Sequence, residues 1–128
     1  MNLKKIIKLV EGRTITQTVD LDREIEGGCG SDLMSDVLHL IKPHTLLITG
    51  LTNIQSIRTA EMVDLPAVLF VRGKCPPPET LELAKQVGVA ILLSPYTMFE
   101  TSGKLFQAGL RGQGKVDCTS ESAMPQAA

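Results

Sequence analysis

Apolar residues in the middle of the chain follow two alternating patterns. Three runs are apolar at nearly every position, which is typical of strands covered on both faces. After each run, apolar residues recur three and four positions apart, as in amphipathic helices. The expected strands are residues 45–49, 67–71 and 89–93, and the expected helices are residues 54–63, 78–87 and 95–108. Asn53 and Ser94 are the expected N-caps of the first and last of these helices. Because strands joined by helices run parallel, the pattern predicts an α/β fold: a single-domain layered sandwich, with a mostly parallel sheet of four to five strands and helices on both faces.

The first quarter of the chain shows weaker patterns. Apolar residues at helical spacing predict a short helix that ends at Gly12; they are Leu3, Ile6, Ile7 and Val10. Residues 13–19 are β-branched and partly alternating, which favours a strand or an extended edge. Residues 24–26 are expected to form a short strand.

A glycine-rich stretch follows and leads into an amphipathic helix expected over residues 32–41. Gly27, Gly28 and Gly30 let the backbone take positive φ values and let another group approach closely. Ser31 is a good helix N-cap, and Asp32 suits the positive end of a helix. Because a helix start leaves free N–H groups that bind anions, this bend is the first candidate for a ligand site.

Three further loops are expected beside this bend, because ligands of parallel sheets collect at the carboxyl ends of the strands. The predicted ligand-binding residues supply backbone amides, hydroxyls, an amide side chain and a cation; they are Gly27, Gly28, Gly30, Ser31, Asp32, Thr49, Gly50, Thr52, Asn53, Arg72, Gly73 and Thr97. Such loops suit a phosphate or a carboxylate. The alternative is structural, since strand-to-helix turns need the same residue types, and Arg72 and Lys74 are also typical of a solvated surface pair. Asp32 opposes a highly charged phosphate unless a cation intervenes.

No motif in the sequence indicates catalysis. The phosphate-binding loop G-x-x-x-x-G-K-[ST] and the G-x-S-x-G nucleophile turn are both absent. The three cysteines and two histidines have no metal-ligand spacing. We therefore predict no catalytic residue, no metal site and no cofactor. One alternative stays open: Cys29 lies near the expected helix start, where a thiolate is favoured.

Composition limits the class of partner. A net charge of −1 and an aromatic content of 3% argue against nucleic-acid binding, and no apolar run is long enough to span a membrane. We expect a cytoplasmic protein with one domain over residues 1–111. The polar residues 112–128 are expected to form a disordered tail.

Several of these segments together resemble the DRTGG domain family. The matching segments are Leu46–Gly50, Asn53–Gln55, Pro78–Ala84, Val89–Leu93 and Pro95–Thr97, while Gly27–Val37 looks like the small stand-alone members. The family's Asp-Arg appears here as Leu51-Thr52, and its Thr-Gly-Gly as Val71-Arg72-Gly73. The resemblance implies an α/β module found beside other domains, as in CBS pyrophosphatases, phosphotransacetylases and, more remotely, HPr kinase/phosphorylase.

The resemblance also implies a regulatory or dimerising role rather than a catalytic one, in the pyrophosphatases next to a bound adenine nucleotide. The expected function is therefore a non-catalytic regulatory module that binds a small anionic ligand, such as an adenine nucleotide, and acts as a homodimer. The alternative is a protein-interaction module without a small ligand, in which Leu3, Ile6 and Ile7 contact a protein partner or a second copy.

Overall fold

A five-stranded sheet forms the centre of the molecule. The computed structural model describes residues 1–16 and 19–115, whose strands pair in the order β1-β5-β4-β3-β2. The strands are β1 (Arg13–Thr14), β2 (Gly27–Gly30), β3 (Thr45–Thr49), β4 (Ala67–Phe70) and β5 (Ala90–Leu93). Strands β2 to β5 run parallel, and β1 pairs antiparallel with β5. The predicted α/β fold with a mostly parallel sheet is confirmed.

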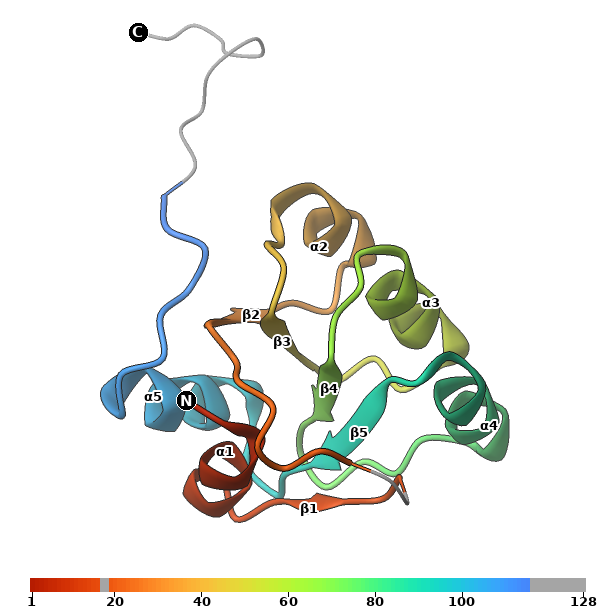
Figure 1. Ribbon diagram of the computed structural model, residues 1–128, viewed down its shortest axis with the longest axis horizontal. Coiled ribbons are helices and arrows are strands. Elements are labelled where there is room, and N and C mark those ends of the chain that lie inside the picture. Colours follow the sequence, from red (N-terminus) through yellow and green to blue (C-terminus); the bar gives the residue numbers. More distant parts are fainter. Residues whose placement is uncertain (17–18, 116–128) are drawn as a thin grey trace, which may run out of the picture.

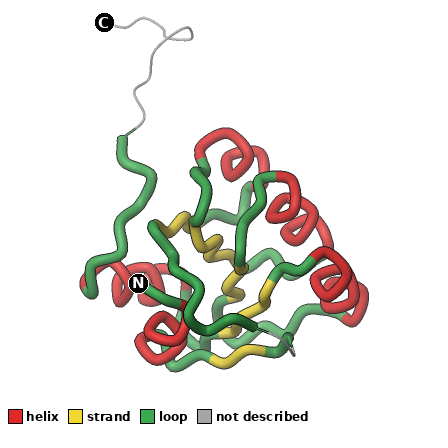
Figure 2. The backbone as a smooth tube through the Cα atoms, viewed as in Figure 1, coloured by secondary structure: helices red, strands yellow, loops and turns green. Residues whose placement is uncertain are grey.

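Helices cover both faces of this sheet. They are α1 (Leu3–Leu9), α2 (Met34–Leu40), α3 (Ile54–Met62), α4 (Pro78–Val87) and α5 (Met98–Gln107). Helices α2, α3 and α4 lie on one face, and α1 and α5 lie on the other (Figure 1). The tube in Figure 2 shows the strands between these two layers. The predicted bounds of α4 are confirmed, whereas α5 begins three residues later than predicted.

The apolar strands serve two separate cores, because neighbouring residues of a strand point to opposite faces. Leu46 and Leu69 pack with residues of α1 and α5 in one cluster. Leu47, Val68 and Phe70 pack with residues of α2, α3 and α4 in the other. Every residue of β3 is buried, as expected for a strand covered on both faces.

Three helix starts test the predicted caps. Asn53 caps α3 as predicted, since its Oδ1 accepts the Gln55 N–H at 3.0 Å. The prediction of Ser94 for α5 is wrong: Thr97 is the N-cap, and the Ser94 hydroxyl donates to the backbone oxygen of Val10 at 2.9 Å.

Ser31 is also not a helix N-cap. Helix α2 begins after Leu33, whose side chain makes no capping bond. The Ser31 hydroxyl instead accepts the Leu33 N–H at 3.0 Å, one turn before the helix.

The amino-terminal segment is more buried than predicted. Leu3 is 2% exposed and Ile6 is fully buried, so the expectation that these two residues contact a partner is wrong. Strand β1 is shorter than the predicted extended segment, in which residues 17–18 lie outside the described part of the chain. The expected strand at residues 24–26 is a single bridge between Asn2 and Glu24.

The carboxyl-terminal segment returns to the sheet edge. Arg111 forms a bridge with Gly27, and its carbonyl accepts the Gly28 N–H at 2.9 Å. Gln113 accepts the Lys42 N–H at 2.9 Å through its side chain. The expected tail begins at residue 112, but its residues 116–128 lie outside the described part. Among the described residues, no helix is long and apolar enough to cross a membrane.

Candidate functional site

The glycine-rich stretch is a strand and not a bend. Gly27–Gly30 form β2, which pairs with β3 in register Gly27↔Thr45 to Gly30↔Ile48. None of these glycines has a positive φ, so that part of the prediction is wrong. The predicted close approach does occur, and the approaching groups belong to the chain itself. An added Cβ would lie 3.0 Å from the Arg111 oxygen at Gly27, and 3.2 Å from a methyl carbon of Leu110 at Gly28.

The carboxylate of Asp32 occupies donors that were expected to bind an anion. Its Oδ1 accepts the Thr49 hydroxyl at 2.9 Å and the Gly50 N–H at 2.7 Å. Bonds to a charged acceptor are stronger than neutral ones. A ligand anion at Gly50 would therefore compete with Asp32, and these two bonds also tie the segment after β2 to the loop after β3.

The loop after β4 holds the neighbouring loops on both sides. The Lys74 ammonium donates to the Gly50 oxygen at 2.8 Å. On the other side, the Arg72 N–H donates to the Tyr96 oxygen at 2.7 Å. Together with the bonds of Asp32, these contacts bring all four predicted loops together at the carboxyl edge of the sheet.

Several predicted ligand residues have structural partners. The carbonyl of Thr52 accepts the hydroxyl of the buried Thr80 at 2.9 Å. Asn53 caps α3, and Thr97 caps α5. Arg72 differs, because within residues 1–16 and 19–115 its exposed guanidinium makes no hydrogen bond or ion pair. Arg72 is thus the predicted site residue with the most donors left for a ligand.

A small cavity of about 210 Å³ lies at this edge. Gly73, Leu93 and Ser94 line it together with Glu11 and Arg13. Gly73 is a predicted site residue, but Glu11 and Arg13 are not, since residues 11–13 show only a helix end and an extended segment in the sequence. The Tyr96 hydroxyl donates to the carboxylate of Glu11, and this bond is the main cause that raises the pKa of Tyr96.

Cys29 lacks the environment expected of a reactive thiol. Its side chain is half-buried against the core beneath α2, α3 and α4. Burial, and secondly the nearby carboxylate of Asp36, raise the pKa of the Cys29 thiol. A raised pKa disfavours the thiolate, so the predicted thiolate-favouring environment is wrong. In the described residues, no group of three His, Cys, Asp or Glu side chains is placed to hold a metal ion.

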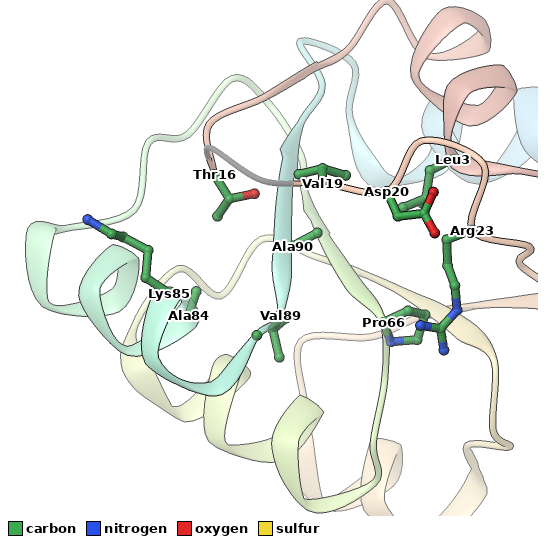
Figure 3. A pocket seen from close by; sticks show the side chains of 11 residues that line it. Leu3, Thr16, Val19, Asp20, Arg23, Pro66, Ala84, Lys85, Val89 and Ala90 are labelled. Carbon is green, nitrogen blue, oxygen red and sulfur yellow. The ribbon is translucent and has the colours of Figure 1, made fainter.

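A larger cavity of about 440 Å³ lies at the opposite, amino edge of β4 and β5, and the sequence analysis did not predict it. Its charged walls are Asp20, Arg23 and Lys85, and Figure 3 shows Lys85 at one end and the other two at the opposite end. Its apolar walls include Leu3 and Val89. Because the walls come from distant parts of the sequence, no local motif indicates this cavity.

Comparison with known proteins places the fold. No family model matches the chain, and no curated protein matches it. The chain is similar to a solved structure of the CBS and DRTGG domains of the regulatory region of Clostridium perfringens pyrophosphatase, complexed with the activator diadenosine tetraphosphate. The TM-score is 0.62 at 14% sequence identity, over 84% of this chain and 46% of that one. The chain therefore spans less than half of that structure and shares the fold of part of a regulatory region.

Proposed function

We propose that the chain is a non-catalytic regulatory module of DRTGG type that binds a small anionic ligand, such as an adenine nucleotide, at the carboxyl edge of the sheet and acts as a homodimer. The observation that carries this proposal is the convergence of the four predicted loops at that edge, through hydrogen bonds of 2.7 to 2.9 Å. The likeness to a regulatory region that was crystallised with diadenosine tetraphosphate supports the proposal.

The charges at this edge indicate where the anionic group binds. Asp32 already accepts the Gly50 N–H, so a second anion is disfavoured there. Arg72 is exposed and directly precedes Gly73, which lines the small cavity, and Arg13 forms part of the same wall. The Glu11 carboxylate in that wall accepts the Tyr96 hydroxyl. We place the negative charge of the ligand between these two arginines, with Gly73 allowing close approach.

Thermal unfolding in the presence of AMP, ATP or diadenosine tetraphosphate tests this proposal. A ligand at 100 times its dissociation constant stabilises the folded state by about 2.7 kcal/mol and raises the melting temperature. Arg72→Ala and Arg13→Ala are expected to weaken binding. Lys85→Ala, which removes a cation at the amino edge, serves as the matched control. Loss of binding in Lys85→Ala alone would move the site to the larger cavity and contradict the proposal.

Asp32→Asn gives a prediction of opposite sign. The amide keeps an oxygen that accepts the Gly50 N–H, while one negative charge at the same edge of the sheet disappears. We expect a dissociation constant up to roughly fivefold lower, because one solvent-exposed charge pair contributes at most about 1 kcal/mol. Isothermal titration at two salt concentrations measures this gain, which should shrink at high salt. An unchanged dissociation constant at low salt would contradict a ligand charge at this edge of the sheet.

A second candidate function is a protein-interaction module without a small ligand. Two exposed aromatic residues on α5 favour it: Phe99 is 86% exposed and Phe106 is 59% exposed. Absence of any thermal shift with the three nucleotides, combined with a stable dimer, would favour this function over the first.

A further inference from the structure

The outer face of α5 is apolar where a surface helix is normally polar. Phe99 and Phe106 are seven residues apart, which places them on one side of the helix two turns apart. Thr101 and Leu105 are buried against the sheet on the opposite side. Single exposed apolar residues are common, but two phenylalanines aligned on one helix face form a patch.

Gly103 lies between the two phenylalanines, and no contact within the described part of the chain requires a glycine there. It is in the helix interior, where glycine costs about 1 kcal/mol relative to alanine. Its φ is not positive, and an added Cβ would meet nothing within 4 Å. Packing within residues 1–16 and 19–115 therefore does not require glycine here, whereas close approach of a second backbone would.

The apolar surface continues from α5 to the edge of the sheet. A groove of about 350 Å³ is lined by Gly28 and Gly30 of β2 and by Phe99, Phe106 and Leu110. Strand β2 is the last strand on this side of the sheet. Arg111 lies over the Phe106 ring, with its guanidinium carbon 4.3 Å from the ring centroid, and holds that ring in place. Phenylalanine and arginine are both enriched in protein interfaces.

We propose that a second copy of the chain covers this face, in a two-fold symmetric dimer in which the two α5 helices cross antiparallel near Gly103. In this arrangement Phe99 of one copy lies opposite Phe106 of the other. Glu100 likewise faces Lys104, so that the charges beside the patch match across the interface. Such matching of a surface with itself is what a two-fold dimer requires. This inference deepens the homodimer of the proposed function by naming the surface where its two copies meet.

Sedimentation velocity of the full chain, from about 1 to 100 μM, tests the dimer. We expect a species of twice the 13.8 kDa chain mass at the upper concentrations. Phe99→Ser and Gly103→Gln should each raise the dimer dissociation constant at least roughly tenfold, a loss of about 1.4 kcal/mol. Met62→Ser is the matched control, since Met62 is 72% exposed on α3, on the other side of the sheet. Circular dichroism checks that each variant is folded.

Three outcomes would overturn the proposal: a monomer at every concentration, variants that dimerise as tightly as the wild type, or dimerisation that appears only after residues 116–128 are removed. The last outcome would indicate that residues 116–128 of the same chain cover this face. Nucleotide shifts measured on the same variants keep the two proposals apart. A Phe99→Ser variant that is monomeric but still binds nucleotide supports both proposals. A dimer that binds no nucleotide supports the proposed interface and contradicts the proposed ligand site.

Discussion

The two faces of the sheet are covered to different extents. Helices α2, α3 and α4 follow consecutive parallel strands and cover their face with a continuous core (Figure 1). Of the described helices, α1 and α5 lie on the opposite face, and an apolar groove remains between α5 and β2. Strand β2 shows both situations in neighbouring residues: Cys29 packs into the three-helix core, while Gly28 and Gly30 line the groove. Both faces thus bury a hydrophobic core, and the two-helix face also has apolar surface left for another molecule.

The largest expected effect is a loss of folding stability at the buried Phe70, compared with the exposed Phe106 on the other face. Phe70 is fully buried beneath the three helices. Phe70→Ala should lower the free energy of unfolding by about 3–5 kcal/mol, the usual cost of emptying a buried aromatic site. Phe106→Ala should change it by less than about 1 kcal/mol under monomeric conditions, because its ring is 59% exposed. Urea unfolding of dilute samples measures both, and equal losses would contradict the difference between the faces.

A smaller loss is expected at Gly12, which joins α1 to β1. A Cβ at this position would lie 2.7 Å from the backbone oxygen of Leu93, so either the loop or β5 must move. Gly12→Ala should destabilise the chain by roughly 1–3 kcal/mol, the range for overpacked sites. The measurement is again urea unfolding. Unchanged stability would show that the backbone at Gly12 or Leu93 can shift at little cost in free energy.

Gly103→Ala should act in the opposite direction. The added methyl group meets no atom of the described residues within 4 Å, and alanine is the better helix former, so the monomer should gain about 0.5–1 kcal/mol. At high concentration the same variant should dimerise less than the wild type. A Gly103→Ala variant that gains monomer stability and dimerises as tightly as the wild type would show that Gly103 does not lie in the interface.

The smallest effect concerns the thiol on the three-helix side of β2. Because burial raises its pKa, Cys29 should react with iodoacetamide at neutral pH at least several-fold more slowly than the exposed Cys75. Peptide mapping by mass spectrometry resolves the two sites.

Cys29 also gives a stability prediction at alkaline pH. Above the ordinary thiol pKa the unfolded chain ionises first, so Cys29 makes stability fall as pH rises toward the raised pKa of the folded state. Cys29→Ala should reduce this alkaline decline, and Cys75→Ala should not. Unfolding curves between pH 7 and pH 10 measure this decline in each variant. An unchanged decline in Cys29→Ala, or equal reactivity of the two thiols with iodoacetamide, would contradict the raised pKa of Cys29.

The sequence predicts the central fold well because its signals are local. The continuous apolar runs at β3, β4 and β5 identify buried strands, and Asn53 is recognisable as a cap from its position alone. Strand β2 has no such signal, since three of its four residues are glycines. What makes it a strand is its pairing with β3 and its packing against Leu110 and Arg111, which lie some 80 residues further along the chain.

The candidate site is predictable in part for the same reason. Parallel topology is enough to gather the four loops at one edge, as expected. The role of Asp32 depends on its contacts with Thr49 and Gly50, 17 and 18 residues away, and no sequence pattern specifies that geometry. Arg13 reaches the small cavity only because β1 turns back antiparallel along β5.

The hydrogen bond from the Arg72 N–H to the Tyr96 oxygen has a mechanical consequence. Tyr96 is joined by one peptide bond to Thr97, the N-cap of α5. A ligand that pulls on Arg72 thus acts, through a single donor and acceptor, on the helix at which two copies of the chain are proposed to meet. One backbone hydrogen bond thus connects the proposed ligand site to the proposed dimer interface.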